Sequence, residues 1–198
     1  MEFVKEFATF LHQNGAIKFG SFKLSSGKES PYYIDLRMVP SFPHQFRKMV
    51  KALQNLIIEK IGLDNFDFIA SVPTSGLVIA SALAIETVKP LIYIRQKPKE
   101  YGTENAIEGT IREGAKVLLV DDVCTTGLSL LNAVKAIRAA KMVVMDTFTI
   151  INRFEGAKEL LASENVRLYE VTNIFTLVSI LHSEKLVDDQ IFDRIKNK

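Results

Sequence analysis

The sequence predicts an α/β protein built on a mostly parallel sheet with helices on both faces. Strand-like and helix-like segments alternate, with strands expected near 66–72, 90–95, 116–121, 142–151 and 166–171 and helices near 76–86, 127–140 and 155–163. The four consecutive aliphatic residues 117–120 are typical of a strand buried on both faces, as in parallel sheets. A length of 198 residues, with 47% hydrophobic and 24% charged residues, suits one soluble globular domain spanning 1–198.

The N-terminal part is expected to add a helix and a small β-rich segment to this sheet. Phe3, Phe7 and Phe10 recur at helical spacing, and Gly15 can end that helix. Residues 16–38 then alternate short β-like pieces with glycine and proline. A long helix is expected next, with Ser41 as its cap and with an apolar stripe of Phe46, Met49, Val50, Leu53 and Ile57.

The remaining segments are a long polar stretch and the C-terminus. Residues 96–105 interrupt the strand–helix alternation and are expected to form a mobile loop. A helix at 173–182 and a shorter one after Lys185 are expected to complete the fold.

Composition excludes several functional classes. A net charge of +2 gives no support for a nucleic-acid partner. No uninterrupted apolar segment is long enough to span a membrane, and the N-terminus lacks the pattern of a signal peptide. A single cysteine suits the reducing cytoplasm, where we expect the protein to reside. The glycine-rich patterns of P-loop and dinucleotide-binding proteins are absent from the sequence.

The most informative segment is 117–129, where a strand, an acid pair and a small-residue loop follow one another. Asp121 and Asp122 come where the strand is expected to end, at the edge where open α/β sheets bind ligands. The loop and the start of the next helix offer backbone N–H groups and hydroxyls, which suit a phosphate. Carboxylates suit a vicinal diol, so the segment predicts a ribose 5-phosphate site. The alternative is an ordinary strand–turn–helix unit in which the aspartates cap the helix.

Two further segments could bind anions. Residues 73–76 again follow a strand and precede a helix, although alone they would indicate only a turn. Arg95, Lys97 and Lys99 precede Gly102 and suit a lid that brings cations onto a leaving group and excludes water. A solvated charged surface is the alternative for this basic run.

Arg153 ends the strand expected at 142–151, on the ligand side of the sheet. A buried arginine needs an anionic partner to offset its desolvation, and its planar fork matches a carboxylate. The alternative is a surface salt bridge with Glu155 or Glu159.

The segment 117–129 resembles the phosphoribosyl-pyrophosphate (PRPP) binding motif of type I phosphoribosyltransferases. Residues 94–103 resemble the catalytic loop of the orotate phosphoribosyltransferases, and 20–37 resemble their hood, with its G-x-F-x-L-x-S-G-x-x-S-P pattern. The resemblance implies the type I fold, with a hood built largely from 16–38 and a flexible catalytic loop at 96–105.

The resemblance also implies a reaction and a set of site residues. Orotate and PRPP would give orotidine 5′-monophosphate and pyrophosphate in UMP synthesis, with Mg²⁺ as cofactor. Lys99, Asp121 and Asp122 would be catalytic, and the two aspartates would contact the metal mainly through substrate and water. Orotate would meet Tyr33, Ile34, Thr125 and Arg153. PRPP would be bound by Thr74, Ser75, Gly76, Arg95, Lys97, Lys99, Tyr101, Asp121, Asp122, Val123, Cys124, Thr125, Thr126, Gly127, Leu128 and Ser129.

The resemblance further implies a homodimer in which the basic loop reaches the active site of the neighbouring subunit. The sequence departs from the family at Ser25, Ser75 and Gln96, where lysines are common. Cys124 is not expected to act as a nucleophile, because no histidine is near it in the sequence.

Two rival functions remain open at this point. A purine phosphoribosyltransferase would keep the fold but lacks the hood segment 30–33. A non-catalytic regulator that binds PRPP or nucleotides would be favoured by the three missing lysines, but no basic or helix-turn-helix extension supports it.

Overall fold

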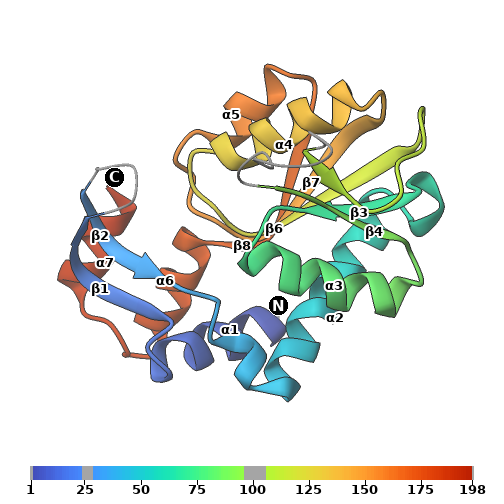
Figure 1. Cartoon of the computed structure of the whole chain (residues 1–198). Helices are drawn as coiled ribbons and strands as arrows, with labels where there is room; N and C mark the ends of the chain where they lie inside the picture. Colours follow the sequence, from blue (N-terminus) through green and yellow to red (C-terminus); the bar gives the residue numbers. More distant parts are fainter. Residues whose placement is uncertain (1, 24–28, 96–105, 198) are drawn as a thin grey trace. The chain divides into compact units, whose positions relative to one another are not determined.

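The computed structural model describes residues 2–23, 29–95 and 106–197. The chain divides into two compact units, one formed by 1–48 with 172–198 and the other by 49–171 (Figure 1). No helix of the described residues is long and apolar enough to cross a bilayer.

The first unit combines a two-stranded sheet with helices from both ends of the chain. Helix α1 (Glu2–Gln13) contacts α6 (Ile174–Ser183), which is followed by α7 (Asp189–Lys196). Strands β1 (Ile17–Lys23) and β2 (Glu29–Ile34) pair antiparallel, so the segment expected to form the hood is a β-ribbon. The 3-10 helix η1 (Val39–Ser41) leads into α2 (Pro43–Lys60), which continues into the second unit.

The second unit contains a six-stranded sheet in the order β5-β4-β3-β6-β7-β8. These strands are β3 (Phe68–Ser71), β4 (Leu91–Ile94), β5 (Ile107–Glu108), β6 (Lys116–Cys124), β7 (Val143–Asn152) and β8 (Arg167–Asn173). Strands β3, β4, β6 and β7 pair in parallel, and β5 pairs antiparallel to β4. The helices are α3 (Ser75–Thr87), α4 (Leu128–Ala139), α5 (Ala157–Ala162) and the short η2 (Leu63–Asn65).

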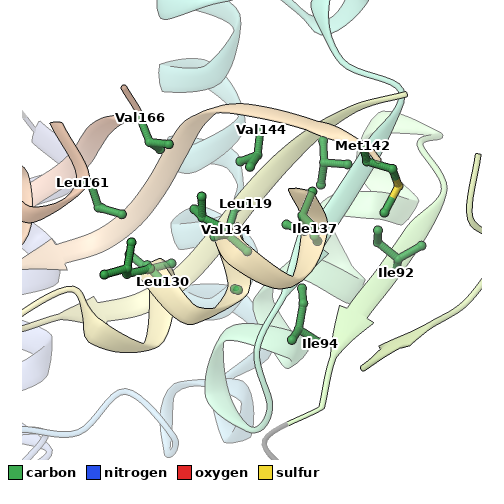
Figure 2. Packing of buried hydrophobic residues seen from close by; sticks show 14 of the residues in the cluster. Ile92, Ile94, Leu119, Leu130, Val134, Ile137, Met142, Val144, Leu161 and Val166 are labelled. Carbon is green, nitrogen blue, oxygen red and sulfur yellow. The ribbon is translucent and has the colours of Figure 1, made fainter. Parts of the chain in front are cut away.

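The main core of this unit lies between α4 and the sheet. Figure 2 shows Leu130, Val134 and Ile137 of α4 packed toward Leu119 of β6 and Val144 of β7. Val134 and Leu119 are fully buried. At roughly 25 cal/mol per Å² of apolar surface, each such side chain contributes about 1.5–3 kcal/mol on burial. This packing fixes the start of α4 against the end of β6, where the phosphate loop was predicted.

The expected α/β fold with a mostly parallel sheet is confirmed, and the helices and strands of the repeating part lie within a few residues of their predicted positions. Two details were wrong. Ser41 lies in η1 and does not cap α2, which begins at Pro43. Strand β6 continues through Asp121 and Asp122 to Cys124 because β7 pairs with it that far, up to Cys124 opposite Asn152. The single-domain organisation stays a prediction.

Candidate active site

The acid pair lies in the last third of β6, at its carboxyl end. Asp121 and Asp122 are both half-buried. The Asp122 N–H donates to Asp121 Oδ1 (2.9 Å), and the Thr149 hydroxyl donates to the Asp122 carbonyl (3.0 Å). Ser71 and Thr149 are fully buried polar residues that support this strand end. Neither residue was predicted from the sequence to support the site, although a hydroxyl residue within an apolar strand is a signal that could have indicated it.

The electrostatics of the pair set Asp121 apart. Burial, followed by the neighbouring charge of Asp122, raises the pKa of Asp121 well above its ordinary range. Two adjacent carboxylates repel each other, so a cation or a set of hydroxyl donors would relieve this cost. The pair is therefore prepared to accept a diol or a metal-bound substrate.

The predicted phosphate loop, residues 125–129, joins β6 to α4. Gly127 is the N-cap of α4 with φ +82°, and no side chain caps this helix. Asp121 and Asp122 lie within β6 and are not the N-cap, so the capping role that the alternative gave them does not hold. A Cβ at Gly127 would lie 3.1 Å from Cα and Cβ of Ala157, so only glycine permits this turn beside α5. The N–H groups of the first helical turn have no acceptor within the helix and suit a phosphate.

The second loop, Pro73–Gly76, joins β3 to α3 and comes close to the acid pair. A Cβ at Gly76 would lie 2.6 Å from Ser71 Oγ and 2.7 Å from Asp121 Oδ1. Thr74 is the N-cap of α3 without a side-chain cap bond, and the Pro73–Thr74 peptide is cis. The second predicted anion loop thus comes close to Asp121, four residues before the first loop begins at Thr125.

Arg153 is buried at the end of β7, as expected. Its side chain is 4% exposed, and its Nη2 lies 3.0 Å from Glu155 Oε1, with Nε at 3.1 Å. The Arg153 N–H donates to the Cys124 carbonyl (2.9 Å), which ties the arginine to the end of β6. The ion pair is the one foreseen as the alternative, but it is buried and not a surface bridge. Arginine carries five N–H donors in a planar fork, a geometry that matches a carboxylate.

Arg95 and Cys124 are two further predicted site residues that the structure describes. Arg95 forms an ion pair with Glu108 across β4 and β5 (2.6 Å). Cys124 is 2% exposed, and burial, followed by the charges of Asp121, Glu170 and Asp122, raises its pKa to about 12. A thiol that stays protonated is not a nucleophile, in agreement with the sequence analysis.

The residues predicted to flank the base belong to the first unit. Tyr33 and Ile34 end β2, where Phe22 packs against the Tyr33 ring and Arg37 donates to the Tyr33 hydroxyl (3.1 Å). Ile34 is 7% exposed. Lys97, Lys99 and Tyr101 lie outside the described residues, as do Ser25 and Gln96.

The acid pair offers carboxylate oxygens, which are suitable ligands for Mg²⁺. Among the described residues, no group of three His, Cys, Asp or Glu side chains could hold a metal. Two carboxylates suit Mg²⁺ only if substrate oxygens and water complete its coordination, which is how this ion commonly binds in phosphate-using enzymes. The residues thus fit a metal that arrives with a pyrophosphate substrate.

Comparison with known proteins gives a consistent result. Residues 44–178 match the phosphoribosyl transferase domain family. The chain is 47% identical to the orotate phosphoribosyltransferase of Cenarchaeum symbiosum over 198 residues, covering 100% of this chain and 99% of that one. It is 38% identical to that of Staphylothermus marinus over 194 residues, covering 98% and 93%. The crystal structure of the Aeropyrum pernix orotate phosphoribosyltransferase superposes with a TM-score of 0.80 at 34% identity, covering 92% of this chain and 99% of that one.

Proposed function

Because the chain belongs to the orotate phosphoribosyltransferase family, we propose that it transfers the phosphoribosyl group of PRPP to orotate, giving orotidine 5′-monophosphate and pyrophosphate for UMP synthesis. The observation that carries this proposal is the close approach of the second anion loop, at Gly76, to Asp121 of the acid pair. Gly76 and the end of β6 are so close that a methyl group would not fit between them. PRPP has the matching chemistry, with a diol between a 5-phosphate and a pyrophosphate.

Different parts of PRPP would be bound by different groups of this chain: the phosphates by backbone N–H groups and hydroxyls, and the ribose hydroxyls by carboxylates. Thr125, Thr126, Gly127, Leu128 and Ser129 would hold the 5-phosphate at the start of α4, and Asp121 and Asp122 would accept the ribose hydroxyls. Backbone groups of Thr74, Ser75 and Gly76 would meet the pyrophosphate, since serine replaces a common family lysine there. When bound, Mg²⁺ would neutralise pyrophosphate charge, held by substrate oxygens with Asp121 and Asp122 nearby.

Catalysis would rest on positioning and charge stabilisation. The ribose C1 gains positive character as pyrophosphate leaves, and the half-buried carboxylates would stabilise that charge. Lys99 would neutralise the leaving group, with Arg95, Lys97 and Tyr101 assisting. Arg95 already pairs with Glu108, so its contribution would require that pair to open.

Orotate would be oriented through its carboxylate. The buried Arg153 offers a bidentate partner of opposite charge, and Tyr33 and Ile34 would flank the ring. This charge match favours orotate over adenine or guanine, which carry no carboxylate. We expect the enzyme to work in the cytoplasm, in agreement with its single buried cysteine.

A homodimer is part of the proposal and is supported by the surface of α3. This helix is largely apolar, yet its Val78 and Ile85 and the C-cap residue Val88 are 40%, 80% and 89% exposed. Such a helix is usually buried, so a second copy of the chain would cover these residues. The basic loop of each subunit would then serve the partner's site.

The assembly is tested by subunit complementation. Lys99→Ala and Asp122→Ala chains should each be inactive alone, because one lacks the loop cation and the other the diol acceptor. Random exchange makes about half of the dimers hybrid, each with one intact site, so roughly a quarter of native activity should return. No recovery, with hybrid formation confirmed by native mass spectrometry, would place the loop in its own subunit.

The substrate is tested by comparing bases. The kcat/KM for orotate with PRPP and Mg²⁺ should exceed that for adenine, guanine and hypoxanthine by several orders of magnitude, because these bases carry no carboxylate to meet the buried Arg153 guanidinium. A preference for a purine base would support the rival purine enzyme. PRPP binding without turnover of any base would support the non-catalytic regulator.

A further inference from the structure

A cavity lies at the end of β6 away from the acid pair, within the second unit. Its volume is about 290 Å³, and it is lined by Lys60, Ile61, Asn65, Phe66, Lys116, Val117, Leu118, Val143, Met145, Asp146 and Arg167. Lys116 begins β6, five residues before Asp121. At about 3.3 Å per residue the two ends are roughly 16 Å apart, so this cavity is separate from the candidate active site.

The floor of the cavity is apolar because of an irregularity in β7. The pairing of β6 with β7 moves from Val117 opposite Val144 to Leu118 opposite Asp146, so Met145 is the additional residue of a β-bulge. Both faces of an interior strand are usually covered, yet Val143 and Met145 are 41% and 55% exposed. Bulges often occur beside binding sites, where they redirect a side chain, and methionine adapts readily to ligands of different shape.

The rim of the cavity is cationic. Lys60, Lys116 and Arg167 face a single lining carboxylate, Asp146. Asp146 is already engaged by Arg167 at 2.8 and 3.0 Å, and Lys60 pairs with Glu59 at 2.7 Å. Among the described residues, the Lys116 ammonium group makes no ion pair. The Lys116 N–H donates to Asp67 (2.8 Å), and the Lys116 charge also acts on that carboxylate. An incoming anion would therefore meet Lys116, which lies near Asp67 without an ion pair, with Lys60 and Arg167 beside it.

We propose that this cavity binds a nucleoside monophosphate, with its phosphate at Lys116 and Arg167 and its base against Val143 and Met145. The volume is close to the lower limit of about 300 Å³ for small-molecule pockets, which suits one nucleotide. Inorganic phosphate alone would leave the apolar floor uncovered, and an uncharged nucleoside would leave the cations unmatched. The site needs both parts of the ligand.

The test follows the Met145 methyl group, which reports on this cavity and not on the active site. The chain has five methionines, so [methyl-¹³C]methionine labelling gives a simple spectrum, and a Met145→Leu variant assigns the signal. Adenosine 5′-monophosphate, adenosine and inorganic phosphate are titrated separately against the full chain. The nucleotide should shift the Met145 signal saturably, with a dissociation constant on the order of 1 mM or lower.

Charge-neutral variants test the role of the rim. Lys116→Gln should weaken nucleotide binding at Met145 by about tenfold, because a charge-assisted contact is lost. Lys135→Gln, on the exposed surface of α4, is the matched control and should leave the affinity unchanged. Thermal melts of both variants check that the fold is retained.

Three results would overturn the proposal. No saturable shift of Met145 would show that the cavity does not bind a nucleotide. Equal effects of Lys116→Gln and Lys135→Gln would remove the anion site. Phosphate or adenosine binding as tightly as the nucleotide would show that only one part of the ligand is recognised. None of these results depends on whether orotate is the substrate.

Discussion

Replacing Gly76 with alanine should damage the use of PRPP far more than it damages the fold. The added methyl group would lie 2.6 Å from Ser71 Oγ and 2.7 Å from Asp121 Oδ1, whereas real Cβ atoms essentially never come within 3.0 Å of such neighbours. Asp121 must therefore retreat by several tenths of an ångström. Its Oδ1 also accepts the Asp122 N–H at 2.9 Å, so both members of the acid pair are disturbed.

The expected loss of stability is small, whereas the expected loss of kcat/KM for PRPP is large. Overpacking costs about 1–3 kcal/mol, and alanine returns up to about 1 kcal/mol of helix propensity at this position in α3. The net destabilisation is at most about 3 kcal/mol, or a fall in Tm of at most about 12 °C for a chain of this size. A reacting group displaced by up to about 1 Å can lose on the order of a hundredfold in rate, so kcat/KM for PRPP should fall by about 10- to 100-fold.

The assay measures initial rates against PRPP at saturating orotate, together with thermal melts. Ser81→Ala, on the same helix but bonded only to the Leu77 carbonyl, is the control and should change neither quantity substantially. Adding Ser71→Ala to Gly76→Ala removes one of the two close contacts, which should recover stability without recovering the PRPP kinetics. Unchanged kcat/KM for PRPP in Gly76→Ala would refute the close approach of the second loop to the diol site.

Further predictions concern the charged groups. The pKa of Asp121 is higher in the folded chain than in the unfolded chain, so the unfolded chain loses this proton at a lower pH. The stability that protonated Asp121 allows below about pH 4 is therefore lost as pH rises toward the folded-state pKa. Asp121→Asn should thus raise Tm at neutral pH in the absence of metal, with a gain that disappears toward pH 4; a pH-independent gain would contradict this origin. Asp122→Asn should keep the fold while costing on the order of 2–4 kcal/mol of transition-state stabilisation with saturating PRPP and Mg²⁺, and unchanged turnover would remove its role. Arg153→Leu should raise KM for orotate much more than KM for PRPP, and it should destabilise the fold by about 3 kcal/mol because Glu155 loses its buried cationic partner. Adding Glu155→Gln should restore stability but not orotate use, whereas equal effects on both substrates would indicate a structural pair only.

The repeating part of the fold could be predicted because its signals are local. The aliphatic run before Asp121 indicates a buried strand by itself, and apolar residues at helical spacing indicate α3 and α4. The end of a strand is harder to predict, because it depends on pairing with another strand. Carboxylates are rare in strands, so this strand was expected to end near Asp121, but pairing with β7 continues to Cys124 and overrides that preference.

Details that depend on a distant partner were not predictable. Strand β5 has only two residues and exists because Tyr93 and Ile94 of β4 pair with it. The bulge at Met145 is set by register, which the alternation of residues does not reveal. The two anion loops were foreseen as separate motifs, while the close approach of Gly76 to Asp121 required the structure. The choice of Glu155 over Glu159 as the partner of Arg153 likewise depends on the geometry of the turn before α5.

The stoichiometry of the products is the most direct test of the proposed reaction. With orotate, PRPP and Mg²⁺, the protein should form orotidine 5′-monophosphate and pyrophosphate in a one-to-one ratio. Both products are measured by chromatography and mass spectrometry. A chain with Asp121→Asn and Asp122→Asn should form neither product while still binding inorganic phosphate at the start of α4. Pyrophosphate released without orotidine 5′-monophosphate, or no reaction by the native chain, would contradict the account.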